Sequence, residues 1–261
     1  MAKTLIDPHC HYHSCFPIGD YWDCAWDNFY RASVKSAQEP GEPILCLTDM
    51  SGTDWFGKIQ QQSLSSLTSH WQVHSTNESE HFRIMNEGRT MHVIASRQVN
   101  SAEGLEVLIV GLRDDPTAQL PLKEYITRYH KDYLIILPWG LGKWLGKRGA
   151  CIDQLFEIAD SKRFVLGDNG GRPSIWSNVP AFSKAKSKKL PILAGSDPLP
   201  LKNQLNRVAA YGIIIDKVFP DEASLVNNLI AFIKRQSMID SYGSLRSLPR
   251  VLVDQFLLRF R

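Results

Sequence analysis

Eight short apolar runs, each followed by a polar or glycine-rich turn, limit the folds that this chain can adopt. The runs span residues 3–7, 44–48, 92–96, 106–111, 133–138, 163–167, 191–194 and 209–215. Most of them are continuous rather than alternating, which is typical of strands buried on both faces of a parallel sheet. Helix-like stretches lie between several runs, at residues 22–38, 122–131, 151–162, 179–189 and 223–235. Strand alternating with helix predicts an α/β fold built from βαβ units.

Residues that carry chemistry follow most of these runs directly. They are residues 7–13 after the first run, Asp49 after the second, Arg97 and Gln98 after the third, Trp139 after the fifth, residues 168–172 after the sixth and Asp197 after the seventh. The carboxyl ends of the strands in a (β/α) barrel meet on one face, whereas an open doubly wound sheet gathers its site at one crevice. The wide spread over strands therefore favours a TIM-like barrel of seven or eight strands. We expect one domain over residues 1–261, with an inserted helix or a polar surface excursion at 57–90 and a C-terminal helical segment at 240–261.

The first run leads into the densest group of metal-ligand side chains in the chain. Three of the eight histidines, His9, His11 and His13, fall within five residues and follow Asp7. Side chains two positions apart at the end of a strand point to the same side, so His9 and His11 should face the same space. Two imidazoles beside a carboxylate make half of a metal site.

These strand-end residues resemble the PHP (polymerase and histidinol phosphatase) domains. The opening Asp7-x-His9-x-His11 is similar to the first motif of that family, Thr48-Asp49 to its Thr-Asp-His and Gly195-Ser196-Asp197 to its Gly-Ser-Asp-x-His. The resemblance spans most of residues 1–220. It implies a distorted barrel, up to three bound metal ions and hydrolysis of phosphate esters.

The chain departs from that family pattern at four positions. Met50, Leu137 and Leu199 stand where the family has histidine, and Gln98 stands where it has an acidic ligand. These losses are incompatible with a full three-metal site, so the resemblance leaves His9, His11 and Asp197 as the ligand set. Two interpretations stay open: these residues hold one divalent ion (Zn, Mn or Fe), or they are the remnant of a lost site.

Other strand-end groups are candidates for binding or catalysis. Residues 139–148 join glycines, two tryptophans, Lys143 and Arg148, which fits either an anion or sugar platform or a plain cover of the barrel end. Asp168 and Arg172 flank a double glycine, which fits either a tight turn or a functional loop. We expect Asp49 or Asp168 to accept a proton, and Arg172 and Lys143 to hold an anionic group.

Composition narrows the choice of partners. A formal net charge of +3 is too small to indicate nucleic-acid binding, and no apolar run reaches the length of a membrane span. Five cysteines without paired spacing and the lack of an apolar leader indicate a cytoplasmic protein with reduced thiols. Oligomeric state is not predicted.

The sequence therefore predicts a metal-assisted hydrolase of a phosphorylated or carbohydrate-derived substrate. The ligand would be a small anionic or sugar-like molecule. The alternative is a catalytically inactive barrel of the same type, which binds a ligand or a partner protein.

Overall fold

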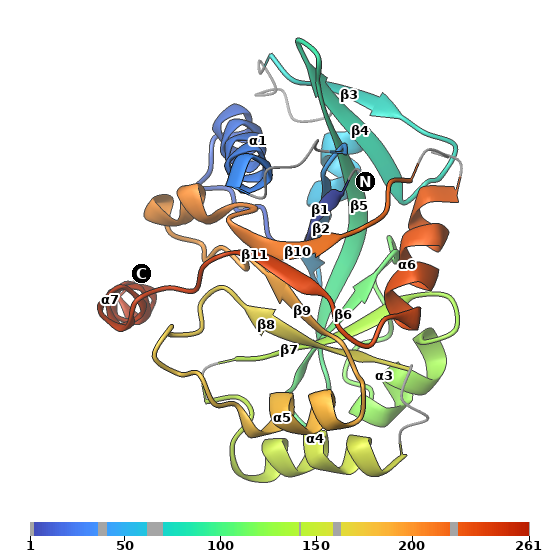
Figure 1. The fold of residues 1–261 in the computed structure, drawn as a ribbon, viewed down its shortest axis with the longest axis vertical. Coiled ribbons are helices and arrows are strands. Elements are labelled where there is room, and N and C mark those ends of the chain that lie inside the picture. Colours follow the sequence, from blue (N-terminus) through green and yellow to red (C-terminus); the bar gives the residue numbers. More distant parts are fainter. Residues whose placement is uncertain are drawn as a thin grey trace.

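The computed structural model describes residues 3–35, 41–61, 70–140, 142–158, 163–219 and 224–260. One mixed sheet organises this part of the chain (Figure 1). Its main path runs β11 (Asp240–Gly243), β10 (Tyr211–Ile215), β1 (Thr4–Cys10), β2 (Ile44–Met50), β5 (Arg89–Asn100), β6 (Glu106–Val110), β7 (Leu134–Pro138), β8 (Val165–Asn169) and β9 (Ile192–Gly195). All eight predicted runs are strands, and the sheet curls into a nearly closed barrel.

Two of the predicted strands run against the others. β6 pairs antiparallel with both β5 and β7, and β10 pairs antiparallel with β1. The continuous apolar runs were typical of a parallel sheet, and these two strands depart from that pattern because an apolar run indicates burial but not strand direction. As a result, the first residues of β6 lie on the same barrel face as the carboxyl ends of β1, β2, β5, β7, β8 and β9.

Contacts between the ends of β9 and β1 draw the two strands together and close the barrel. The Asp197 amide donates to the His9 carbonyl at 2.9 Å, and the Ser196 amide donates to a carboxylate oxygen of Asp7 at 3.0 Å. Gly195 permits this approach, since a Cβ atom there would lie 2.7 Å from the Cβ of His9. The first and last predicted strand-end motifs thus meet across the closure.

Helices cover the outside of the barrel in the predicted order. They are α1 (Ile18–Lys35), α2 (Trp55–Gln60), α3 (Leu122–Tyr129), α4 (Gly146–Ile158), α5 (Pro180–Ser187) and α6 (Leu225–Arg235). A short 3₁₀ helix, η1 (Lys202–Arg207), follows β9. In the described ranges, no helix is both long and apolar enough to cross a membrane.

The segment at 57–90, predicted as an inserted helix or a polar excursion, contains a β-hairpin. After α2, β3 (Gln72–Ser75) pairs with β4 (His81–Asn86), and β4 extends the sheet along the first half of β5. Residues 62–69 lie outside the described part of the chain. The polar composition concealed these strands because one face of the hairpin meets solvent.

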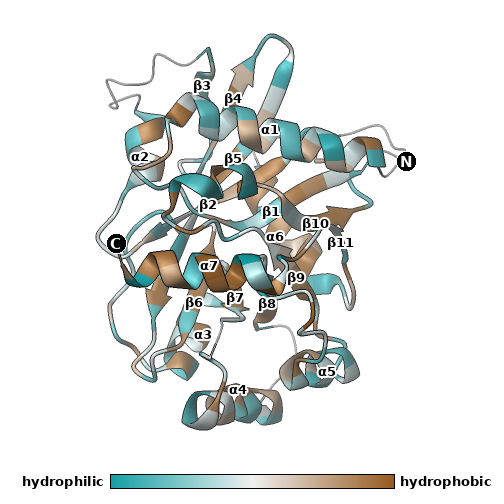
Figure 2. Cartoon of the chain, turned by 90° about the vertical axis from the view of Figure 1, so that its left-hand side faces the viewer, coloured by the Kyte–Doolittle hydropathy of each residue, from teal (hydrophilic) through white to brown (hydrophobic). Residues whose placement is uncertain are grey.

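The C-terminal segment at 240–261 contains the predicted helix, preceded by the edge strand β11. Helix α7 (Leu248–Arg259) lies across the barrel face that carries the strand carboxyl ends (Figure 2). Only Val251 and Asp254 are its fully buried residues. Both line the cavity described below, so the helix forms part of the cavity wall rather than of the outer helical layer.

Candidate functional site

Four electron-pair donors converge where β1, β5 and β9 end. Nε2 of His9 lies 3.0 Å from Nε2 of His11, and Oε1 of Gln98 lies 3.2 Å from the first and 3.1 Å from the second. Oδ1 of Asp197 lies 3.6 Å from the His9 nitrogen and 3.5 Å from the His11 nitrogen. Two ligand atoms that each lie about 2.1 Å from one ion are about 3.0 Å apart when the ligand–ion–ligand angle is a right angle. They are about 3.4 Å apart when that angle is tetrahedral. The spacing fits one metal ion.

Neighbouring groups fix the direction in which these donors point. Nδ1 of His11 lies 2.7 Å from the Thr48 carbonyl, which only accepts hydrogen bonds, so Nδ1 carries the hydrogen and Nε2 presents a lone pair. The side-chain amide of Gln98 donates to Glu106 at 3.3 Å, which turns its carbonyl oxygen toward the histidines. The Nε2 lone pair of His11 and the carbonyl oxygen of Gln98 therefore both face Nε2 of His9. Either a proton on the His9 nitrogen or a cation must lie between these three atoms.

Burial favours the metal-binding form of His9. His9 is 4% exposed and His11 is 5% exposed. Burial, opposed in part by the charge of Asp197, lowers the pKa of His9 to about 4, so its imidazole is neutral at neutral pH. A neutral imidazole releases no proton when it binds a cation.

Asp7, the first residue of the histidine motif, has a structural role rather than a ligand role. Its carboxylate accepts hydrogen bonds from the amide of His9 and from both the amide and the hydroxyl of Ser196. Burial raises the pKa of Asp7 to about 7 despite these donors. Asp7 therefore joins β1 to β9 and holds His9 in place, while Asp197 supplies the carboxylate of the cluster.

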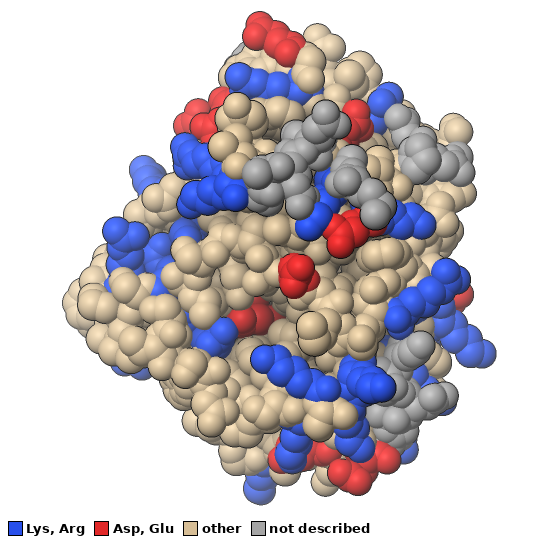
Figure 3. Space-filling model, viewed as in Figure 1, with Lys and Arg blue, Asp and Glu red and all other residues tan. Residues whose placement is uncertain are grey.

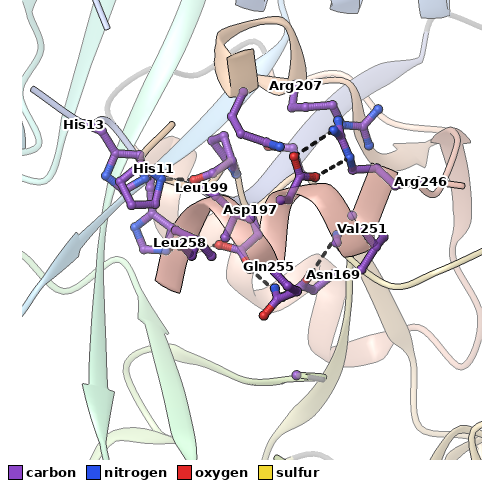
Figure 4. Close-up of a pocket in the computed structure, with 18 of the residues that line it drawn as sticks. His11, His13, Asn169, Asp197, Leu199, Arg207, Arg246, Val251, Gln255 and Leu258 are labelled. Atoms are coloured by element: carbon purple, nitrogen blue, oxygen red, sulfur yellow. Dashed lines mark hydrogen bonds and ion pairs between the residues drawn. The ribbon is translucent and has the colours of Figure 1, made fainter. Parts of the chain in front are cut away.

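A cavity of about 310 Å³ opens beside the cluster. Strand-end residues, η1 and α7 line it together. Figure 4 shows His11 and His13 at one end, Arg207 and Arg246 at the other, and Asp197 between them. Met50 and Leu199, which stand where the resemblance expects histidines, contribute apolar side chains to the same lining.

Lys143 reaches the cavity as predicted but is already paired. Its ammonium contacts the carboxylate of Glu106, which itself accepts from Gln98. Glu106 was missed in the sequence because a parallel β6 would have placed it on the opposite face. The antiparallel direction of β6 is the reason that this carboxylate lies in the site.

Asp49 does not line the cavity. Its two carboxylate oxygens accept from the amides of Trp55 and Phe56, each at 3.0 Å, at the start of α2. Burial raises the pKa of Asp49. The Asp49 carboxylate thus binds the first amides of α2, and the predicted part of this residue in proton transfer gains no support from its contacts.

Asp168 and Arg172 bind each other. Two hydrogen bonds of 2.7 Å join the guanidinium to the carboxylate, and the Tyr211 hydroxyl donates to the same carboxylate at 2.8 Å. Arg172 also donates to the Trp176 carbonyl. With these partners the two side chains brace the loop after β8, and the predicted roles of proton acceptor and anion holder gain no support.

The tryptophans of residues 139–148 pack as cover for the barrel end. Trp139 is 5% exposed and meets Trp176 edge to face at 5.7 Å, and Trp144 meets Phe182 at 5.9 Å. Leu141 lies outside the described residues. The contacts agree with the structural interpretation of this loop, although a second cavity of about 370 Å³ lies along it.

Comparison with known proteins gives a fold but no family. No protein-family model and no curated protein matches the sequence. The crystal structure of PsfC from Pseudomonas syringae PB-5123 is similar over 99% of this chain and 98% of its own, with a TM-score of 0.58 and 13% identity.

Two further structures are weaker matches. The lesion-specific endonuclease PfuEndoQ from Pyrococcus furiosus has a TM-score of 0.49 at 11% identity. The match covers 87% of this chain and 56% of that chain. Endonuclease Q in complex with a 27-mer duplex that carries an abasic lesion has a TM-score of 0.45 at 12% identity, with 87% of this chain and 57% of that chain covered. At such identities the likeness concerns the fold alone. The chain is a mixed α/β protein with a nearly closed barrel of parallel and antiparallel strands, a fold similar to that of PsfC.

Proposed function

We propose that this chain is a metal-dependent hydrolase that acts on a small phosphorylated substrate. The observation that carries the proposal is the convergence of His9, His11, Gln98 and Asp197 at ligand spacing next to a cavity. A divalent ion bound there supplies Lewis-acid activation of water and of a phosphoryl oxygen. The three-residue set expected from the sequence gains Gln98 as a neutral fourth donor.

The remaining steps fall to residues that line the cavity. Glu106 contacts both Gln98 and Lys143, so it is the carboxylate best placed to accept a proton near the cluster. Lys143, which is 40% exposed, can turn from Glu106 toward an anionic substrate. This assignment replaces Asp49 and Asp168, whose carboxylates are used elsewhere.

The size of the cavity supports a small molecule as the substrate. A volume of about 310 Å³ lies at the lower end of the range for metabolite sites. On the face shown in Figure 3, Lys and Arg form separate groups among acidic and uncharged residues rather than one continuous basic band. The small cavity supports the expectation that nucleic acid is not the substrate.

Turnover of p-nitrophenyl phosphate, with and without added Mn²⁺ or Zn²⁺, tests the proposal. We expect metal-dependent hydrolysis that His11→Ala abolishes and His70→Ala, at an exposed histidine outside the site, leaves intact. Stoichiometric metal binding without turnover of this or any other phosphate ester would favour the alternative, a ligand-binding barrel that has lost its activity.

A further inference from the structure

The end of the cavity opposite the histidines carries two arginines with one acidic partner. Arg246 binds Asp254 of α7 through Nε at 2.7 Å and Nη2 at 3.1 Å. Arg207, at the end of η1, donates to the Ser244 carbonyl at 3.0 Å and has no ion pair within 4.0 Å among the described residues. The carboxylate of Asp254 is taken up by Arg246, so Arg207 has no acidic partner of its own at contact distance among these residues.

Arg207 keeps its charge in this position. Burial and, second, the neighbouring charge of Arg246 lower the pKa of Arg207 to about 10, so the guanidinium is protonated at neutral pH. Arg207 is half-buried, and a partly desolvated cation next to a like charge is less favourable than one with an anion bound beside it. The arrangement is therefore one that a bound anion would stabilise.

A buried amide without a partner lies in the same wall. Gln204 is 2% exposed and lines the cavity, and its Nε2 makes no hydrogen bond in the described part of the chain. A buried amide donor left unpaired costs roughly 1–3 kcal/mol, so such groups are rare unless a ligand or water satisfies them. The cavity thus offers a neutral donor in addition to the two cations.

We propose that Gln204, Arg207 and Arg246 form an anion subsite that binds a phosphate or carboxylate group of the substrate remote from the scissile bond. The inference rests on the proposed function and adds a substrate class to it: a small molecule with two anionic groups, one at the histidine cluster and one at this subsite. Guanidinium forks and an amide donor match the oxygens of such a group.

The loop after β8 fixes the backbone position of Arg246 in the subsite. The Ser174 amide donates to the Arg246 carbonyl at 2.8 Å, and Pro173 and Arg246 form an isolated parallel bridge. The buried pair of Asp168 and Arg172 braces this loop from within. Asp168 and Arg172, which the sequence predicted to act on the substrate, therefore support the backbone of Arg246, a member of the proposed subsite.

Titration of the full chain, freed of divalent metal, with inorganic phosphate and separately with succinate tests the subsite by calorimetry. We expect one phosphate or one carboxylate site per chain, and the two probes show which anion is preferred. Arg207→Gln should weaken the binding by roughly tenfold or more, since it removes charge-assisted hydrogen bonds. Gln204→Leu should weaken it about threefold or more, and Arg259→Gln, at an exposed arginine of α7, should leave it unchanged.

Several results would overturn the subsite. One is that neither anion binds to the unmodified chain, and another is that Arg207→Gln binds the anion as tightly as the unmodified chain. A third is that Arg259→Gln loses as much affinity as Arg207→Gln, which would indicate nonspecific attraction. If circular dichroism shows that Arg207→Gln does not fold, Arg207→Lys replaces it and should still lose affinity several-fold, because an ammonium does not reproduce the fork. His9→Ala separates the two proposals: it should lose metal binding and keep anion binding. Arginine-dependent anion binding in a chain that binds no metal would retain the subsite and refute the hydrolase.

Discussion

Arg172→Gln should destabilise the fold strongly because it breaks a buried ion pair. The side chains of Arg172 and Asp168 are 9% and 11% exposed and share two hydrogen bonds of 2.7 Å. Removing one partner of a buried pair costs about 3–5 kcal/mol, because the other charge stays buried without compensation. The Tyr211 hydroxyl still donates to Asp168 in the variant, so we take the lower end, about 3 kcal/mol.

Thermal unfolding measures this loss, and the chain contains a matched control. For a domain of this size, about 3 kcal/mol corresponds to a fall in Tm of about 6–12 °C. Arg128 and Glu124 make a pair with the same four-residue spacing and a contact of 2.7 Å, but their side chains are 46% and 45% exposed. Arg128→Gln should therefore cost no more than about 0.5 kcal/mol, or about 2 °C.

The opposite pattern would refute this reasoning. If Arg172→Gln unfolded within about 2 °C of the unmodified chain but lost phosphate binding or turnover, Arg172 would act on the ligand rather than brace the loop. The role expected from the sequence alone would then be restored.

Three further predictions concern the closure, the pH dependence and the proton acceptor. Gly195→Ala should weaken metal binding measured by equilibrium dialysis, because its Cβ would lie 2.7 Å from that of His9 and displace the ligand; an unchanged dissociation constant would contradict the close approach. Burial lowers the pKa of His92 from 6.5 to about 4, so the unfolded chain binds this proton first as the pH falls, and stability is lost between about pH 6.5 and pH 4. The loss should reach about 2 kcal/mol at pH 5 in urea titrations and shrink in His92→Gln but not in His70→Gln. Glu106→Gln should lower kcat for p-nitrophenyl phosphate by roughly a hundredfold and leave metal content unchanged, whereas an unaltered kcat would remove this carboxylate from proton transfer.

The strands and the first half of the site could be predicted because both follow from local patterns. Continuous apolar runs located eight of the eleven strands in the described part of the chain, and the two-residue spacing of His9 and His11 placed their imidazoles together, as the structure confirms. The distant Asp197 could be added only through the family resemblance. Its position beside both histidines agrees with that expectation.

The features that could not be predicted depend on strand direction and on contacts between residues that are distant in sequence. Glu106 reaches the site because β6 is antiparallel, and a hydrophobic run carries no direction. The polar excursion concealed a β-hairpin. Asp168 has the position of a catalytic carboxylate, but its role depends on Tyr211, 43 residues later, which the sequence does not link to it.

Metal content of the purified chain, measured by mass spectrometry after dialysis against Zn²⁺ or Mn²⁺, tests the central claim most directly. We predict one ion per chain, lost in His11→Ala and in Asp197→Ala and retained in His70→Ala. Met50 and Leu199 bring apolar side chains to the cavity where further ligands would be needed, so a second tight ion is not expected. No bound ion in the unmodified chain, or one that survives both His11→Ala and Asp197→Ala, would contradict the account.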